Sequence, residues 1–166
     1  KVTVSDEDGI LIATPKYYAD SAFTEPVTDI VFTNTYSAPN GTVILEAAKI
    51  LTGRDLLAEE FDFVVTECAT GKPVAYGDNV SEAVNGSAAK VTFSSISYTL
   101  AQVRGDNNAT SRSFEYWMAE VKPVHLKGIA ENTQKFKVIV TVTDTGDGRL
   151  ETSAQYYKVG ENDTLT

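Results

Sequence analysis

The feature that most constrains the fold is a two-residue alternation of apolar and polar side chains, which recurs along the whole chain. This period places alternate side chains on opposite faces of a β-strand, whereas a helix needs a period of about 3.6. Clusters of Gly, Pro, Asn and Asp separate the alternating segments, as turns separate strands. Strands are predicted at 30–36, 43–51, 61–66, 90–93, 114–121, 136–143 and 150–157. The best helical stretch, 53–60, is a turn or two at most, so the pattern predicts an all-β, antiparallel sandwich.

The composition of the 166 residues argues against several function classes. With 23 acidic and 14 basic residues, a net charge of −9 disfavours nucleic acid and anionic membrane surfaces as partners. No apolar run approaches the roughly 20 residues that a membrane-spanning helix needs. One cysteine, Cys68, and one histidine, His125, exclude an internal disulfide and a His/Cys metal cluster, and they disfavour a Ser-His-Asp triad. We therefore expect no metal, no cofactor and no enzymatic turnover.

The two ends of the chain resemble each other. Val2-Thr3-Val4, Asp8-Gly9, Leu11 and the pair at 17–18 match, in order, residues 140–142, 147–148, 150 and 156–157. Such an echo indicates tandem repeats sampled out of register. Residues 1–36 are then the C-terminal hairpin and last strand of a preceding repeat, or a strand donated to another copy. Residues 37–166 form the next repeat without its own last strand.

Three polar side chains, Lys49, Glu120 and Asn34, occupy faces that the alternation otherwise makes apolar. Their apolar neighbours on those faces are at 43, 45, 47 and 51, at 114, 116 and 118, and at 30, 32 and 36, respectively. Such groups are rarely buried without a partner. One interpretation is that each residue turns back to solvent at a strand end. The other is that the three residues take part in a chemical reaction.

That chemistry would be a self-made crosslink. Removal from water favours a neutral lysine amine, which can attack a carbonyl, and a protonated glutamate, which can polarise an asparagine amide. The amine attacks the amide carbon, the glutamate shuttles protons and ammonia leaves. The product is a Lys–Asn isopeptide bond, made once and without turnover.

The motifs around these residues resemble the streptococcal-type pilin isopeptide-linkage domain. The matching stretches are LEAAKILTGRDL at 45–56, EFDF at 60–63, FEYWMAE at 114–120, the hairpin 140–150 with its Asp-Gly turn, and FTNTY at 32–36. The resemblance implies an Ig-like antiparallel β-sandwich of a Gram-positive surface fibre with self-formed isopeptide bonds. By position it implies that Lys49 is the amine, Glu120 the catalytic acid and Asn34 an amide donor.

The order of the motifs departs from the family. In the family the lysine comes first and the asparagine last within a domain, whereas Asn34 precedes Lys49 here. The resemblance implies that the first and last strands run parallel, and a parallel connection needs a dozen or more residues. Residues 37–42 are too few, so Asn34 and Lys49 are not expected to bond within one chain. We expect the sandwich to be completed instead by another copy or by a longer parent chain.

The function indicated is a structural repeat of a Gram-positive pilus or adhesin stalk, extracellular and attached to the cell wall. Its expected partners are neighbouring repeats or copies of itself, with a host surface ligand also open and no membrane insertion. The alternative is a glycan- or protein-binding β-sandwich module of a secreted adhesin, because a fold does not fix a function.

Overall fold

The computed structural model describes residues 1–160. The chain divides into two compact units, Lys1–Tyr36 and Ser37–Thr166. The origin of the first unit, as part of a preceding repeat or as a donor to another copy, stays a prediction. Each unit is described by itself below.

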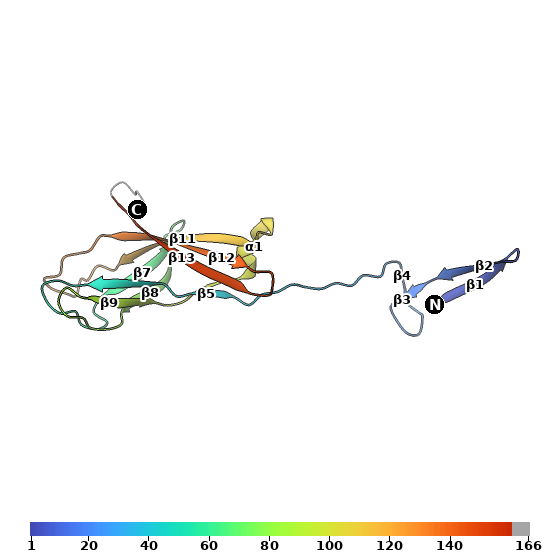
Figure 1. Cartoon of the computed structure of the whole chain (residues 1–166), viewed down its shortest axis with the longest axis horizontal. Helices are drawn as coiled ribbons and strands as arrows, with labels where there is room; N and C mark the ends of the chain where they lie inside the picture. Colours follow the sequence, from blue (N-terminus) through green and yellow to red (C-terminus); the bar gives the residue numbers. More distant parts are fainter. Residues whose placement is uncertain (161–166) are drawn as a thin grey trace. The chain divides into compact units, whose positions relative to one another are not determined.

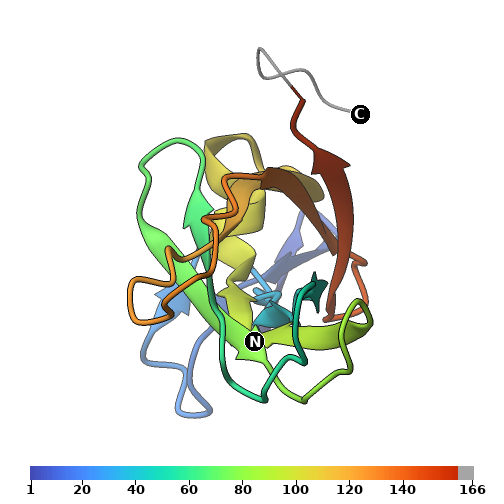
Figure 2. The same ribbon diagram turned by 90° about the vertical axis from the view of Figure 1, so that its left-hand side faces the viewer.

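The second unit is built on a seven-stranded antiparallel sheet in the order β13-β12-β11-β7-β8-β9-β6. The sheet curls around its core, as the views along and across the strands show (Figures 1 and 2). Its strands, in chain order, are β6 (Glu46–Ile50), β7 (Asp62–Glu67), β8 (Pro73–Asn79), β9 (Ala88–Phe93), β11 (Ser111–Glu120), β12 (Lys135–Asp144) and β13 (Leu150–Lys158). The all-β, Ig-like antiparallel fold predicted from the sequence is confirmed.

Smaller elements complete the second unit. Strand β5 (Gly41–Val43) pairs with β10 (Ile96–Tyr98) outside the large sheet. A single-turn helix α1 (Leu100–Arg104) and the 3₁₀ turn η1 (Gly105–Asn107) lead into β11. The helix begins with a capping box, in which Thr99 and Gln102 each bond the other's backbone amide. This Thr-x-x-Gln signal was present in the sequence, but the helix was not predicted from it.

The core follows the alternation. In β12 the side chains of Val138, Val140 and Val142 are fully buried, while the residues between them face outward or are half-buried. The predicted strand 43–51 is interrupted after Val43, so that β5 and β6 pair with different partners. The stretch 53–60, a turn or two of helix at most by its sequence, contains no helix: the structure has bends, turns and an isolated bridge from Leu56 to Ala83 there.

The first unit contains two short hairpins. Strand β1 (Val2–Glu7) pairs with β2 (Ile10–Pro15), and β3 (Tyr17–Tyr18) pairs with β4 (Pro26–Val27). The β1–β2 hairpin turns at Asp8 and Gly9, both with positive φ, and it is the counterpart of the β12–β13 hairpin in the sequence echo. The predicted strand 30–36 is not formed. No described residue between Val27 and Gly41 belongs to a strand, because this segment has no partner strand to pair with here.

Candidate functional site

Lys49 projects into the core from β6. Its side chain is only 9% exposed. It shares the inner face with Leu45, which is fully buried, and with Leu51, as the alternation predicts. Strand β6 holds this register through its antiparallel ladder with β9, in which Lys49 lies opposite Ala89.

Glu120 comes to the same point from the last residue of β11. Its carboxylate Oε2 lies 2.7 Å from Lys49 Nζ, and its side chain is 3% exposed. On β11 it shares a face with Met118 and Tyr116, both buried, as the sequence pattern predicts. The alternative, that these two residues turn back to solvent, is therefore wrong. Two residues 71 positions apart in the sequence form a buried ion pair.

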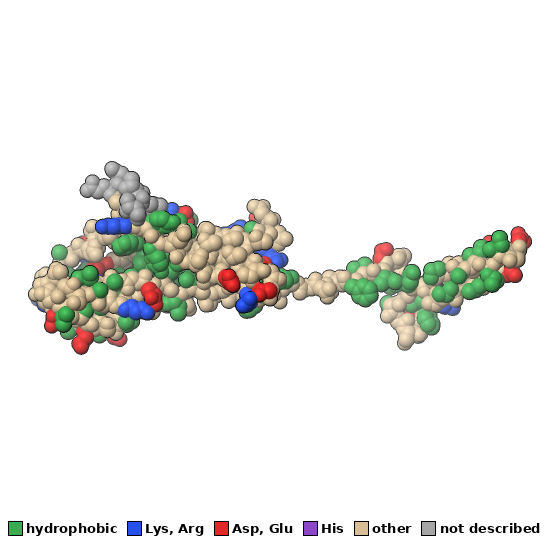
Figure 3. Space-filling view, viewed as in Figure 1, with side chains coloured by type: hydrophobic (Ala, Val, Ile, Leu, Met, Phe, Trp, Pro, Cys, Tyr) green, Lys and Arg blue, Asp and Glu red, His purple; other side chains and the backbone are tan. Residues whose placement is uncertain are grey.

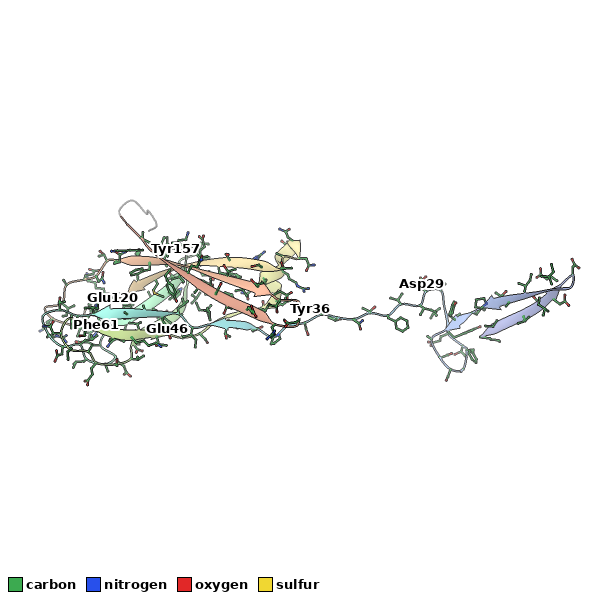
Figure 4. All side chains as sticks on the ribbon, in the orientation of Figure 1. Asp29, Tyr36, Glu46, Phe61, Glu120 and Tyr157 are labelled. Atoms are coloured by element: carbon green, nitrogen blue, oxygen red, sulfur yellow. The ribbon has the colours of Figure 1, made fainter. Side chains whose placement is uncertain are left out.

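The ammonium of Lys49 also stacks on an aromatic ring. Its Nζ lies 3.9 Å from the centroid of Phe61, a cation–π contact, and that ring is fully buried. Asn79, also fully buried, fixes this part of the backbone. Its side-chain oxygen accepts hydrogen bonds from the amides of Glu60 and Phe61, and its amide group donates to the carbonyls of Leu57 and Ser81. Figure 4 shows Phe61 and Glu120 at the same end of the second unit.

One oxygen of the site has no partner. Glu120 Oε1 is buried and makes no hydrogen bond, although a buried carboxylate oxygen normally accepts at least one. A groove of about 260 Å³ lies over the pair. It is lined by β6 residues 47–50, β11 residues 118–120, Phe63, Phe136, Asn132 and Gln134. The site thus combines an amine, a carboxylate with a free acceptor, and space for a third group.

The groove runs along an open edge of β6. Four successive β6 residues line it, and since successive side chains point to opposite faces, the groove must border the edge of the strand. Within residues 1–160, β6 pairs only with β9, and β13 pairs only with β12, so each is an edge strand of the sheet. The side chain of Tyr156 on β13 reaches across to β6, where its hydroxyl accepts from the amide of Glu46 at 3.4 Å. No described β-ladder joins the two edges.

Asn34, the third predicted site residue, belongs to the first unit. It is exposed and lies outside any strand, so the prediction that it sits on the apolar face of a formed strand is wrong for this structure. The Lys49–Glu120 pair belongs to the second unit. The role of Asn34 as an amide donor stays a prediction.

Sequence reasoning missed the aromatic and amide residues around the pair. Phe61 could have been assigned to the core from its even spacing with Phe63 and Val65, which are all buried. Asn79 carried no signal of this kind, because it lies in β8, a strand that the pattern did not predict. Asn132 and Gln134 come from the loop before β12, and nothing in their neighbourhood marks them as groove residues.

Comparison with models of known protein families identifies the family of the chain. Residues 45–166 match the family described as FctA, Spy0128-like isopeptide containing domain. The chain belongs to this family. The search of curated proteins found no match. The pilin-type membership predicted from the motifs is confirmed, and it makes the chain a surface-exposed structural domain. Within the described residues, no helix is long and apolar enough to cross a bilayer, and no three His, Cys, Asp or Glu side chains cluster as metal ligands would.

Proposed function

We propose that the chain is a stalk or fibre module of a Gram-positive surface structure, strengthened by an isopeptide bond between Lys49 and an asparagine. The observation that carries the proposal is the buried pair of Lys49 and Glu120, with an unpartnered Oε1 on a glutamate that lines a groove. A purely structural ion pair does not require a carboxylate oxygen that lacks a hydrogen-bond donor. A site that binds a third polar group does require such an oxygen.

Proton transfer within the pair would make Lys49 a nucleophile and Glu120 an acid. Burial of two charges is costly, and the 2.7 Å separation lets a proton pass from Nζ to the carboxylate, which leaves a neutral amine and a carboxylic acid. An asparagine carboxamide in the groove would then receive a hydrogen bond from the acid at its oxygen. That bond polarises the carbonyl and opens Cγ to attack.

The reaction needs no reactant other than the lysine, the glutamate and the asparagine. The lone pair of Nζ forms a bond to Cγ, and the bond between Cγ and the amide nitrogen breaks. Glu120 carries the amine's proton to the leaving nitrogen, which departs as ammonia. The carboxyl is regenerated, but the amine is consumed, so each site reacts once. The Phe61 ring supports the ammonium before the reaction and gives the amine a dry surface during it.

The mechanical consequence follows from the position of Lys49 on β6. A covalent bond from this edge strand to an added strand lets tension pass between them without breaking the hydrogen-bonded ladders of the sheet. A module of this kind holds under load, as a stalk requires.

The test supplies the amide as a peptide. The chain carrying Asn34→Ala is mixed with a synthetic peptide of residues 28–36, so that the only strand with this motif is the added one. The expected product has the summed mass less one ammonia, with the linkage at Lys49. It should be absent with Glu120→Ala. It should persist with Lys90→Ala, which breaks the exposed Lys90–Glu46 pair at 2.6 Å. A product in the Glu120→Ala background, or no linkage at Lys49 in the parent, would contradict the proposal.

A further inference from the structure

The groove over Lys49 contains a side-chain amide whose orientation is fixed. Gln134 lies in the loop before β12, is half-buried, and lines the same groove of about 260 Å³ as Lys49 and Glu120. Its Nε2 donates to the carbonyl of Lys135 at 2.7 Å and to the carbonyl of Val159 at 2.9 Å. Because both acceptors are carbonyl oxygens, the nitrogen must be the end of the amide that faces them. The oxygen Oε1 accepts no hydrogen bond from any residue in the range 1–160.

The β11–β12 ladder places this amide beside Glu120. The last pair of the ladder is Ala119 and Lys135. Continued by one residue, the same register puts Glu120 opposite Gln134. Residues directly opposite each other in an antiparallel pair have their Cβ atoms about 4.5–5.5 Å apart on one face of the sheet. Two neighbouring side chains, each with an oxygen that lacks a donor, therefore line one groove.

We propose that Gln134 Oε1 accepts a hydrogen bond from the carboxamide nitrogen of the asparagine that bonds to Lys49, and so orients that carboxamide in the groove. This inference rests on the proposed function and names a further substrate-orienting residue of the same site. A carboxamide has an acceptor at its oxygen and donors at its nitrogen. The protonated Glu120 supplies the donor for the oxygen, and Gln134 supplies the acceptor for the nitrogen. Of the two ways in which the carboxamide could lie, only the one with its oxygen toward Glu120 satisfies both groups.

The same hydrogen bond strengthens as the reaction proceeds. Lys49 Nζ bonds to Cγ, the bond from Cγ to the amide nitrogen breaks, and this nitrogen leaves as ammonia with the proton carried by Glu120. The leaving nitrogen gains positive charge when it takes that proton. The carbonyl dipole of Gln134 faces this charge, and two backbone carbonyls hold the dipole in place beforehand. A preorganised dipole aimed at a developing charge stabilises the transition state more than the ground state, so Gln134 should raise the rate more than the affinity.

The competing role for Gln134 is purely structural. Its two bonds tie the first residue of β12 to the residue after β13, where the amide of Val159 also donates to the carbonyl of Lys135 at 3.3 Å. With this role alone, its loss would change the shape of the groove and would weaken the binding of a strand as much as its reaction. Surface charge offers no further source of orientation, because acidic and basic side chains are interspersed on the face of the second unit that Figure 3 shows.

The test measures the rate at which the Asn34→Ala chain bonds to peptide 28–36, over a range of peptide concentrations. Adding Gln134→Met removes the carbonyl acceptor at similar side-chain length. We expect the rate constant at saturating peptide to fall about tenfold, as the loss of one hydrogen bond predicts. The half-saturating concentration should stay within about twofold, since the interaction is made mainly in the transition state. The Asn34→Ala form of the peptide, which binds without reacting, should compete equally well in both chains.

Two further variants complete the test. Gln155→Met makes the same substitution at an exposed glutamine of β13 outside the groove, and it should leave both kinetic values unchanged. Gln134→Ala also lacks the acceptor and should give the same fall in rate without a loss of affinity. It replaces Gln134→Met if urea unfolding shows that the methionine variant does not fold.

The outcomes separate this inference from the proposed function. If loss of Gln134 leaves the saturating rate unchanged, its oxygen does not contact the carboxamide. If the half-saturating concentration and the competition by the unreactive peptide weaken along with the rate, Gln134 only shapes the groove. Either result overturns the inference, and the proposed function stands. If the chain with Gln134 intact does not bond to peptide 28–36 at all, both fail.

Discussion

Removing the carboxylate of Glu120 is expected to destabilise the unbonded chain strongly. The pair is close, with Nζ and Oε2 at 2.7 Å, and its side chains are 9% and 3% exposed. In Glu120→Leu the ammonium of Lys49 keeps only the Phe61 ring as a partner. Breaking one member of a buried ion pair costs about 3–5 kcal/mol, because the remaining charge stays out of water. We expect a loss in this range.

Removing both charges should recover most of that loss. In the double variant Lys49→Met/Glu120→Leu two apolar side chains replace the buried charges, next to Met118 and Phe136. Replacing a buried pair by hydrophobic residues of similar volume is often neutral or stabilising, so the double variant should lie within about 1 kcal/mol of the parent or above it. The coupling energy between the two positions would then be about 3 kcal/mol or more.

The assay is urea unfolding of the four proteins of this cycle, after intact mass has shown that Lys49 is unbonded. The midpoint should shift while the m-value stays constant. Lys90→Met is the matched control, because the Lys90–Glu46 pair is as short but each side chain is more than half exposed, and its loss should cost less than about 1 kcal/mol. If Glu120→Leu costs no more than this control, the pair is not desolvated and the reasoning fails.

Three further predictions concern the surroundings of the site. Asn79→Leu deletes four hydrogen bonds to the backbone near Phe61 and should lower the unfolding free energy by about 3 kcal/mol or more in urea melts; a loss below about 1 kcal/mol would mean that the loop is held by other contacts. Gly77→Ala places a Cβ 2.6 Å from the carbonyl oxygen of Thr92 and should cost about 1–3 kcal/mol, seen as a lower thermal midpoint; an unchanged midpoint would show that the β8–β9 ladder yields without cost. The hydrogen bond from Arg54 lowers the pKa of Glu60, so its stabilisation is complete above the unfolded pKa, about 4.3, and is lost as the pH falls through the lower folded value. Urea melts at pH 7 and pH 3 should therefore show a smaller loss of stability in Arg54→Leu than in the parent, and equal losses would refute the role of this ion pair.

The faces of the strands could be predicted from the sequence, whereas strand partners could not. Alternation alone placed Lys49 and Glu120 on the inner face, because a residue's face depends only on its parity within the strand. Their meeting could not follow from parity, since β6 and β11 lie at non-adjacent positions in the sheet order. The motif resemblance supplied that pairing instead.

The main failures have physical causes. Segment 30–36 has the alternation of a strand, but it forms none because a strand exists only with a partner to satisfy its backbone groups. Strand β8 was missed because Pro73 and Gly77 interrupt its pattern, although both are accommodated within the antiparallel ladder with β7. The role of Asn79 depends on four backbone groups, three of which come from residues 18 to 22 positions away, and no local pattern encodes such an arrangement.

The most direct measurement is the fragment spectrum of the Lys49-containing peptide, taken from the Asn34→Ala variant after incubation with peptide 28–36. We expect a branched peptide in which Lys49 Nζ is joined to the asparagine side chain of the added peptide, with one ammonia lost and with no such product when Glu120→Ala is also present. Recovery of Lys49 only as a free amine would contradict the assignment of Lys49 and Glu120 as a bond-forming pair.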